Sequence, residues 1–563
     1  MPVVTRRTVL AGAAGALLAR PVEAPAMPER RPPNVVLIVT DDQAYGDLGL
    51  HGNRHLRTPW LDRLGTEGVR LDRFYVSPVC APTRASLMTG RWNYRTCAID
   101  TWLGRAMLHP EEVTLAEMLR SAGYRTGLFG KWHLGDNFPM RPIDRGFEEA
   151  LHHNGGGMCQ PADPPDGSYF DPLLRRNGRW VRERGYCTDV FGRHAVRFIE
   201  RNRNRPFFLY LATNAPHSPL QAPEELVASY RSMGLGENTA RVYAMVENID
   251  DNVGRVLACL DALRLAENTI VVYLSDNGPC PSQRDPGQPT RYNAGLRDEK
   301  GTVYDGGIRV PCFLRWPAGW PGGRRVDRVA AHVDLAPTIL EACGVAAPDQ
   351  VAFDGRSLHP LLARDGAPWA DRDLFFQWHR GDEPVAWRNC AVVNQRWKLV
   401  EGRELYDLQA DPSESRDAAA ENPAEVARMR EAYERWFRDV SATRGYAPPR
   451  IVLGSPRENP STLTRQDWRG PRAGWEPDAL GHWEVRIEAA GDYRVRLRFA
   501  PVQEGCAAEL RVGGVVARRA LRSGAASCTF DRVRLPEGEA RLEAWVEQHG
   551  QTVGVHYADV QRL

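Results

Sequence analysis

The chain has 563 residues, more than one hydrophobic core usually organises, and this length predicts two or three folded units. Hydrophobic residues make up 42% and charged residues 26%, a balance that is typical of globular proteins and excludes a disordered chain. Lysine and arginine total 73 against 71 acidic residues, and a net charge of +2 without a basic tail argues against nucleic acid as a partner.

The first residues contain the three parts of an export signal in order. Arg6 and Arg7 precede an apolar run at residues 11–19, and Ala24-Pro25-Ala26 has the small side chains of a cleavage site. The order resembles a twin-arginine signal peptide over residues 1–26, which predicts a periplasmic or secreted protein. A disordered basic leader or an uncleaved anchor is the alternative. The apolar run is too short to span a bilayer, and no membrane span is expected elsewhere.

Three apolar runs have the composition of buried parallel strands. Residues 34–40 are followed directly by Asp41-Asp42, and residues 269–275 by Asp276-Asn277. Residues 205–213 are followed by a segment that contains His217. Amphipathic helical patterns lie between them, at residues 58–65, 114–122 and 241–263. The alternation predicts an α/β domain over residues 34–374, with a large, mainly parallel sheet flanked by helices. Ligands bind at the carboxyl ends of strands in such folds, where these polar residues fall.

The C-terminal part has a different pattern. Residues 375–447 contain short strands followed by a helical segment, which predicts a small antiparallel subdomain packed on the main domain. Pro448 and Pro449 then indicate a linker. Residues 457–563 contain short alternating strands with turn residues between them and no helical period, which predicts an accessory β-sandwich.

Cys80 opens the segment CAPTRASLMTGR, residues 80–91. From the residues alone, it is a cysteine at a helix start with Arg84 one turn on, an arrangement that favours an anion but also fits a buried cysteine beside an ion-paired arginine. The segment matches the sulfatase signature, C-x-P-x-R followed by S-x-L-x-T-G-R, at every position. The chain is therefore identified as resembling the sulfatase family over roughly residues 34–417, which implies an alkaline phosphatase-like fold and a sulfuric ester hydrolase.

The resemblance also assigns a cation site. Asp41, Asp42, Asp276 and Asn277 offer only hard oxygen ligands, which suit Ca²⁺ or Mg²⁺ better than zinc. Either pair alone fits Asx caps at strand ends, but together, beside the signature, they resemble the calcium site of the family. In that family the signature cysteine, here Cys80, also contributes a ligand after its oxidation to formylglycine by a dedicated maturation enzyme.

Three further segments resemble family motifs. Lys131 and His133 lie in GKWHLG, where the family lysine binds the formylglycine hydroxyl and the sulfate and the histidine acts as base in the second step. His217 lies in APHSP, whose histidine helps to protonate the leaving group, and Lys300 corresponds to a second sulfate-binding lysine. The alternatives are incidental charges on a turn, a structural histidine and a solvated charge run. The family pocket serine after the strand is not identifiable near Asn154.

The resemblance implies that a hydroxyl of the hydrated aldehyde attacks sulfur, and that the second hydroxyl later allows sulfate to be expelled. The expected substrate is a sulfated glycan or small aryl sulfate. A phosphonate or phosphate ester hydrolase of the same superfamily is the nearest alternative, and Asn277 disfavours it because those enzymes tend to carry histidine there. A carbohydrate-binding protein with an inactive core is the other alternative. In the predicted β-sandwich, the indole rings either stack on sugars or fill the core; they belong to Trp468, Trp475, Trp483 and Trp545.

An odd number of cysteines, eleven in all and without a CxxC pair, predicts no disulfide framework, although one or two bridges stay open.

Overall fold

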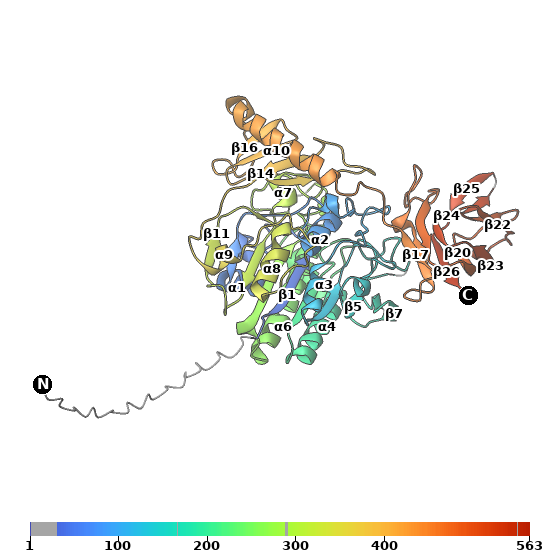
Figure 1. Ribbon diagram of the computed structural model, residues 1–563, viewed down its shortest axis with the longest axis horizontal. Coiled ribbons are helices and arrows are strands. Elements are labelled where there is room, and N and C mark those ends of the chain that lie inside the picture. The colour runs from blue at the N-terminus through green and yellow to red at the C-terminus, as the bar shows by residue number, and fades with distance from the viewer. Residues whose placement is uncertain (2–30, 166, 288–290, 549) are drawn as a thin grey trace.

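The computed structural model describes residue 1 and residues 31–165, 167–287, 291–548 and 550–563. The signal predicted for residues 1–26, with Arg6 and Arg7, therefore lies outside the described residues apart from Met1. Figure 1 shows a large α/β body, a small sheet covered by α10, and a separate all-β unit that ends at the C-terminus.

A ten-stranded sheet forms the centre of the body, in the order β11-β2-β10-β9-β1-β8-β4-β5-β6-β7. Its five central strands are parallel, and they are β9 (Thr269–Ser275), β1 (Asn34–Thr40), β8 (Phe207–Ala212), β4 (Arg125–Gly130) and β5 (Glu149–His152). The edge strands are β10 (Cys312–Arg315), β2 (Val69–Leu71), β11 (Arg324–Val326), β6 (Leu173–Arg176) and β7 (Arg179–Arg182). Their pairings are antiparallel, except that β11 pairs with β2 in parallel. The predicted α/β class with a mainly parallel, helix-flanked sheet is confirmed.

Helices cover both faces of this sheet because its central strands are apolar on both sides. Along β1 the buried side chains alternate, with Val35 and Leu37 in one hydrophobic cluster and Val36 and Ile38 in the other. The first cluster is closed by α2 (Cys80–Thr89), α3 (Leu115–Ser121), α8 (Leu335–Cys343) and α9 (His359–Ala363). The second is closed by α1 (Pro59–Glu67), α4 (Cys187–Asn202), α5 (Glu224–Arg231) and α6 (Glu237–Ala262).

A four-stranded antiparallel sheet packs on the body through a third cluster. Its strands are β13 (Leu374–Gln377), β14 (Cys390–Val393), β15 (Trp397–Val400) and β16 (Glu404–Asp407). The helix α10 (Pro423–Ser441) covers it, and Trp436 stacks on Phe375 with ring centroids 5.0 Å apart. Body elements beneath it include α7 (Asp305–Ile308) and the short pair β3 (Phe74–Tyr75) and β12 (Ala330–Ala331).

The C-terminal unit consists of two facing sheets. One contains β17 (Ile451–Leu453), β19 (His482–Ile487), β24 (Gly538–Gln548), β21 (Ala507–Val512), β22 (Val515–Ala520) and β25 (Gln551–Gly554). The other contains β18 (Ser461–Thr464), β26 (Tyr557–Arg562), β20 (Gly491–Arg498) and β23 (Ser527–Leu535). The strand β17 precedes residue 457, so the sandwich includes residues before the expected boundary. Its hydrophobic core also takes in Leu103, Met107 and Met140 of the body, which joins the two units.

All eleven cysteines lie within the described residues and are free thiols, so neither of the disulfides left open by the sequence is formed. Among the described residues, none of the helices combines the length and the apolar character needed to cross a bilayer.

Candidate active site

Four oxygen-bearing side chains meet where β1 and β9 end. The two strands are parallel and in register up to the pair Thr40 and Ser275, so the residues that follow them emerge side by side. Asp41, Asp42, Asp276 and Asn277 are fully buried there. The backbone of Asp42 is in the left-handed region, at φ 66°, a conformation that residues other than glycine adopt rarely. The structure thus brings together these four of the five predicted cation ligands, and Cys80 is the fifth.

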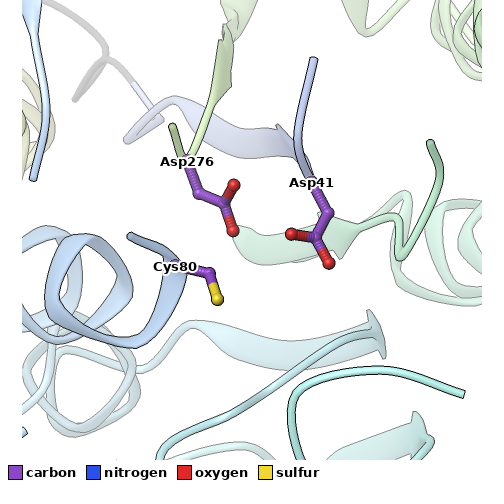
Figure 2. A group of neighbouring side chains, drawn as sticks. All are labelled: Asp41, Cys80 and Asp276. Atoms are coloured by element: carbon purple, nitrogen blue, oxygen red, sulfur yellow. The ribbon is translucent and has the colours of Figure 1, made fainter. Parts of the chain in front are cut away.

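The oxygen atoms of this group fit a cation. Asp41 Oδ1, Asp42 Oδ2 and Asn277 Oδ1 are buried and have no hydrogen-bond partner among the described residues. A buried carboxylate oxygen without a donor is costly, and a divalent cation is the group that satisfies several at once. Figure 2 shows the carboxylates of Asp41 and Asp276 with the sulfur of Cys80 turned toward the same space. One potential ligand atom from each of these three residues lies within 4.8 Å of the others.

Cys80 is the first residue of α2, and its side chain is buried. The helix ends at Gly90, whose φ of 67° allows the left-handed C-cap. Burial raises the pKa of the Cys80 thiol, although the charges of Lys131 and Lys300 oppose this effect. The unmodified thiol is therefore protonated at neutral pH and is a poor nucleophile.

Three cations pair with the three carboxylates. The Arg84 guanidinium donates through Nε and Nη2 to Asp276 Oδ2, at 2.9 and 2.7 Å. Lys131 Nζ donates to Asp41 Oδ2 at 2.6 Å, and Lys300 Nζ donates to Asp42 Oδ1. Although burial alone raises the pKa of Asp42, Lys300 and His217 hold it below its ordinary value. The charges therefore compensate one another, and an anion that enters the site finds fixed positive groups.

His133 is a neutral base in this arrangement. Burial, followed by the charge of Lys131, lowers its pKa well below the ordinary value. Its Nε2 lies 2.8 Å from the carbonyl oxygen of Thr101, which can only accept, so Nε2 carries the hydrogen. The other ring nitrogen, Nδ1, is buried without a partner among the described residues and keeps its lone pair.

His217 and Lys300 line the pocket together. The Nδ1 atom of His217 lies 2.7 Å from the carbonyl oxygen of Ser218, and its Nε2 is 3.8 Å from Asp42 Oδ2. Burial lowers the pKa of His217 to about 4, and Asp42 only partly offsets this effect. Lys300 behaves oppositely: burial disfavours its charge, but Asp42 raises its pKa well above the ordinary value. Lys300 is therefore the permanent charge on this side.

A pocket of about 340 Å³ connects this group to solvent. The sequence motifs miss the rest of its lining, which is Val79, Thr101, Trp102, Gly156, Gln160, Cys280, Pro281, Gly301, Trp378, Arg380 and Trp475. Gly156 has a steric role, because a Cβ there would lie 2.7 Å from His133 Cε1. A Cβ at Gly157 would lie 2.9 Å from His217 Cε1. The run of three glycines after β5 was the signal available in the sequence.

Comparisons with known proteins find similar sequences and a similar fold. The family description "Sulfatase" matches residues 33–345, and "N-sulphoglucosamine sulphohydrolase, C-terminal" matches residues 295–435. Steryl-sulfatase of Mus musculus is 32% identical over 459 residues, covering 67% of this chain and 72% of that protein. Arylsulfatase A of Homo sapiens is 33% identical over 411 residues, covering 68% and 78%. The crystal structure of Ps i-CgsB in complex with k-i-k-neocarrahexaose has a TM-score of 0.66 at 30% identity, covering 74% of this chain and 95% of that one.

Proposed function

This chain belongs to the sulfatase family and is a sulfuric ester hydrolase, and from that premise we propose that it removes sulfate from carbohydrate sulfate monoesters with formylglycine derived from Cys80. The observation that carries the proposal is the convergence of Cys80 with Asp41 and Asp276. Each of the two carboxylates is paired with a buried basic side chain. A carbohydrate is favoured over an aryl sulfate by the likeness to Ps i-CgsB, which was crystallised with an oligosaccharide.

The proposed cofactor is Ca²⁺, with Mg²⁺ as the other hard cation that fits, held by Asp41, Asp42, Asp276, Asn277 and residue 80. The unpartnered oxygens of three of these residues support this assignment. When bound, the cation supplies positive charge that lowers the energy of developing negative oxygen. Formylglycine supplies, as its hydrate, the nucleophilic hydroxyl and the second hydroxyl that a plain serine or cysteine lacks.

The proposed roles of the charged residues follow from their protonation. Lys131 and Lys300 hold sulfate oxygens, and Arg84 fixes Asp276 and adds charge beside residue 80. His133 accepts a proton at Nδ1, the free ring nitrogen, while Nε2 stays bonded to Thr101. His217 is neutral in the free protein, and an anionic ester beside it favours the protonated ring that can donate to the leaving oxygen.

Mass spectrometry and one variant test the proposal. The peptide containing residue 80 is expected to carry formylglycine, and Cys80→Ala is expected to abolish hydrolysis of sulfated monosaccharides and of 4-methylumbelliferyl sulfate. Cys259→Ala on α6 is the control and is expected to retain activity. Full activity with an unmodified thiol would contradict the mechanism. A phosphate ester turned over faster than its sulfate counterpart would instead favour the phosphoesterase alternative.

Maturation and export are further parts of the proposal. We infer that a formylglycine-generating or other sulfatase-maturing enzyme oxidises Cys80, and that the segment with Arg6 and Arg7 directs periplasmic or secreted localisation. Twin-arginine transport carries folded proteins, so modification could precede passage. Replacing both arginines with lysine is expected to retain the enzyme in the cytoplasm, and unaltered export would exclude this route.

A further inference from the structure

The β-sandwich forms part of the pocket wall. Trp475, from the loop before β19, lines the same cavity as Cys80 and His133. Its ring meets the ring of Trp102, from the body, edge to face with centroids 5.0 Å apart. Gln466 also belongs to the sandwich. Its side-chain Nε2 donates to the Thr101 carbonyl at 2.9 Å, and its backbone carbonyl accepts from Gly104 N. The sandwich therefore holds the loop that lies between it and the catalytic group.

The tryptophans of the sandwich divide into two kinds. Trp468 and Trp483 are fully buried in the core between the two sheets. Trp475 is only partly buried and faces the cavity, and Trp545 is partly buried outside the cavity. Burial in the core explains the first pair, but it does not explain an indole ring on a pocket wall.

A cation packs against Trp102 and one further indole ring of the same wall, that of Trp378. The Arg380 guanidinium is 4.9 Å from the Trp102 ring centroid and 5.2 Å from that of Trp378. Asp100 holds the cluster together, because it accepts from Arg380 Nη1 at 2.8 Å and from Trp378 Nε1 at 3.0 Å. The Arg380 side chain is 51% exposed, so its remaining donors can still reach a ligand.

The charge at this rim is not balanced by its own ion pairs. Asp100 also lies 3.8 Å from Arg105, which in turn pairs with Asp382 at 2.7 Å. Arg469 from the sandwich pairs with the same Asp382 at 2.8 Å. Three guanidinium groups thus share two carboxylates, and the surplus positive charge favours an anionic ligand.

We propose that Trp102, Trp378, Trp475 and Arg380 form a subsite, shared between the body and the sandwich, for the sugar ring next to the sulfated one. Indole faces pack against sugar rings, and Arg380 pairs with an anionic substituent of that neighbouring ring, either a second sulfate or a carboxylate. The inference rests on the proposed function for the position of the cleaved sulfate at Cys80. It makes an oligosaccharide with more than one anionic group the favoured substrate.

Kinetics with a matched pair of variants test the aromatic part. Trp475→Ala is compared with Trp545→Ala, which removes an indole ring from the same sandwich outside the cavity. The probes are 4-methylumbelliferyl sulfate and chondroitin sulfate, heparan sulfate and carrageenan fragments from disaccharide to hexasaccharide. Trp475→Ala is expected to raise KM for the oligosaccharide that is cleaved by about tenfold or more, with kcat nearly unchanged. The small aryl sulfate is expected to be unaffected, and Trp545→Ala is expected to change neither.

A second pair tests the charge. Arg380→Gln is compared with Arg511→Gln, because Arg511 is 49% exposed, pairs with Glu509 at 2.7 Å and lies 4.9 Å from the Trp545 ring centroid. Only Arg380→Gln is expected to weaken the binding of oligosaccharides that have a charged neighbouring ring, by roughly tenfold. Fragments with a neutral neighbouring ring are expected to be unaffected. Fragments with a second sulfate and fragments with a carboxylate identify which anion Arg380 binds.

Binding is measured separately from turnover, so that the subsite and the proposed reaction can fail independently. Calorimetric titration of the same fragments into Cys80→Ala, alone and combined with Trp475→Ala, reports the subsite even without hydrolysis. Weaker oligosaccharide binding on loss of Trp475 supports the subsite. Equal losses for both probe classes, or no loss for either, would overturn it, whatever the fate of Cys80.

Discussion

The α/β body and the β-sandwich contribute to one pocket in different ways. The body supplies the charged side chains around Cys80, and its three carboxylates there are paired with Arg84, Lys131 and Lys300. The sandwich supplies an indole ring and an amide, from Trp475 and Gln466. Both family matches end by residue 435, before the sandwich begins. From this difference we infer that the reaction is determined by the body, and that the sandwich contributes to discrimination among substrates through the proposed subsite.

This division predicts two classes of variant. A change among the buried charges alters an interaction that every substrate needs, so it lowers the rate on all of them. A change on the outer wall alters contacts that only a long substrate makes, so it separates long from short substrates. A body variant that distinguishes substrates, or a sandwich variant that abolishes the reaction, would contradict the division.

Asp276→Ala is expected to give the largest effect. It removes a proposed cation ligand and leaves Arg84 without its buried partner, so activity on every sulfate ester is expected to fall by about 10³-fold or more. Metal content is measured in parallel by mass spectrometry of the purified protein. Asp334→Ala is the control, since Asp334 is also fully buried and pairs with Arg372. Retained metal in both variants would remove Asp276 from the proposed ligand set.

Removal of the cation tests the same group from the ligand side. A strong chelator is expected to reduce turnover of long and short substrates alike by about 100-fold or more. Ca²⁺ or Mg²⁺ is expected to restore it better than Zn²⁺, because the proposed ligands are all oxygen atoms. Preferential recovery with Zn²⁺, together with phosphatase activity, would indicate a different metal chemistry.

The sequence was most informative where strands or motifs are continuous. The predicted strands at residues 34–40 and 269–275 coincide with β1 and β9. A continuous run of apolar, β-branched residues is typical of a parallel strand that is buried on both faces. The convergence of Asp41 with Asp276 then followed from parallel strand ends. The helical segment predicted at residues 114–122 corresponds to α3, which Thr114 caps through a reciprocal bond with Glu117.

The outer pocket was not predictable in this way. The contact between Trp102 and Trp475 joins two loops without periodicity, far apart in the chain. The sequence left the role of Trp475 open, because a tryptophan in a strand-rich segment looks the same in the sequence whether its ring fills the core or lies at the surface. Only the docking of the sandwich on Leu103 and Met140 places its ring on the pocket wall.

Gly156→Ala tests how tightly the body positions its base. The added Cβ would lie 2.7 Å from His133 Cε1, closer than carbon atoms normally approach, so the imidazole must move. We expect kcat to fall by about 10- to 100-fold on long and short substrates alike. Gly514→Ala, where no atom lies within 4 Å of the new Cβ, is the control. An unchanged kcat would show that the His133 ring has room to adjust.

Gln466→Ala tests whether the sandwich also affects the reaction itself. The Gln466 side chain reaches the catalytic group through the Thr101 carbonyl, which also bonds His133. Its loss is therefore expected to reduce kcat modestly, by about fivefold, with KM unchanged. The reduction is expected to be equal for the aryl sulfate and the oligosaccharide. A change in KM for the oligosaccharide alone would assign Gln466 to the subsite instead.

The smallest expected effect concerns two carboxyl groups at the junction of the body and the sandwich. Burial raises the pKa of Asp136 to about 6, although hydrogen bonds from Gly155 N at 2.9 and 3.1 Å oppose the shift. Burial and the nearby charge of Asp136 raise the pKa of Asp467 well above its ordinary value. One oxygen of Asp467 has no partner among the described residues.

The sign of the pH dependence follows from these raised values. Between the ordinary pKa and the raised one, the folded protein binds more protons than the unfolded chain, so the free energy of unfolding falls as the pH rises through this window. Asp467→Asn removes the charge that must otherwise be buried at high pH. It is therefore expected to raise the thermal unfolding midpoint by a few degrees at pH 8 and by less at pH 5, which lies closer to the ordinary pKa of a carboxyl group. An equal shift at both pH values would mean that the folded protein and the unfolded chain bind the same number of protons at this site between pH 5 and pH 8, which contradicts a raised pKa of Asp467. A loss of stability at pH 8 would mean that the charge of Asp467 is compensated at the junction.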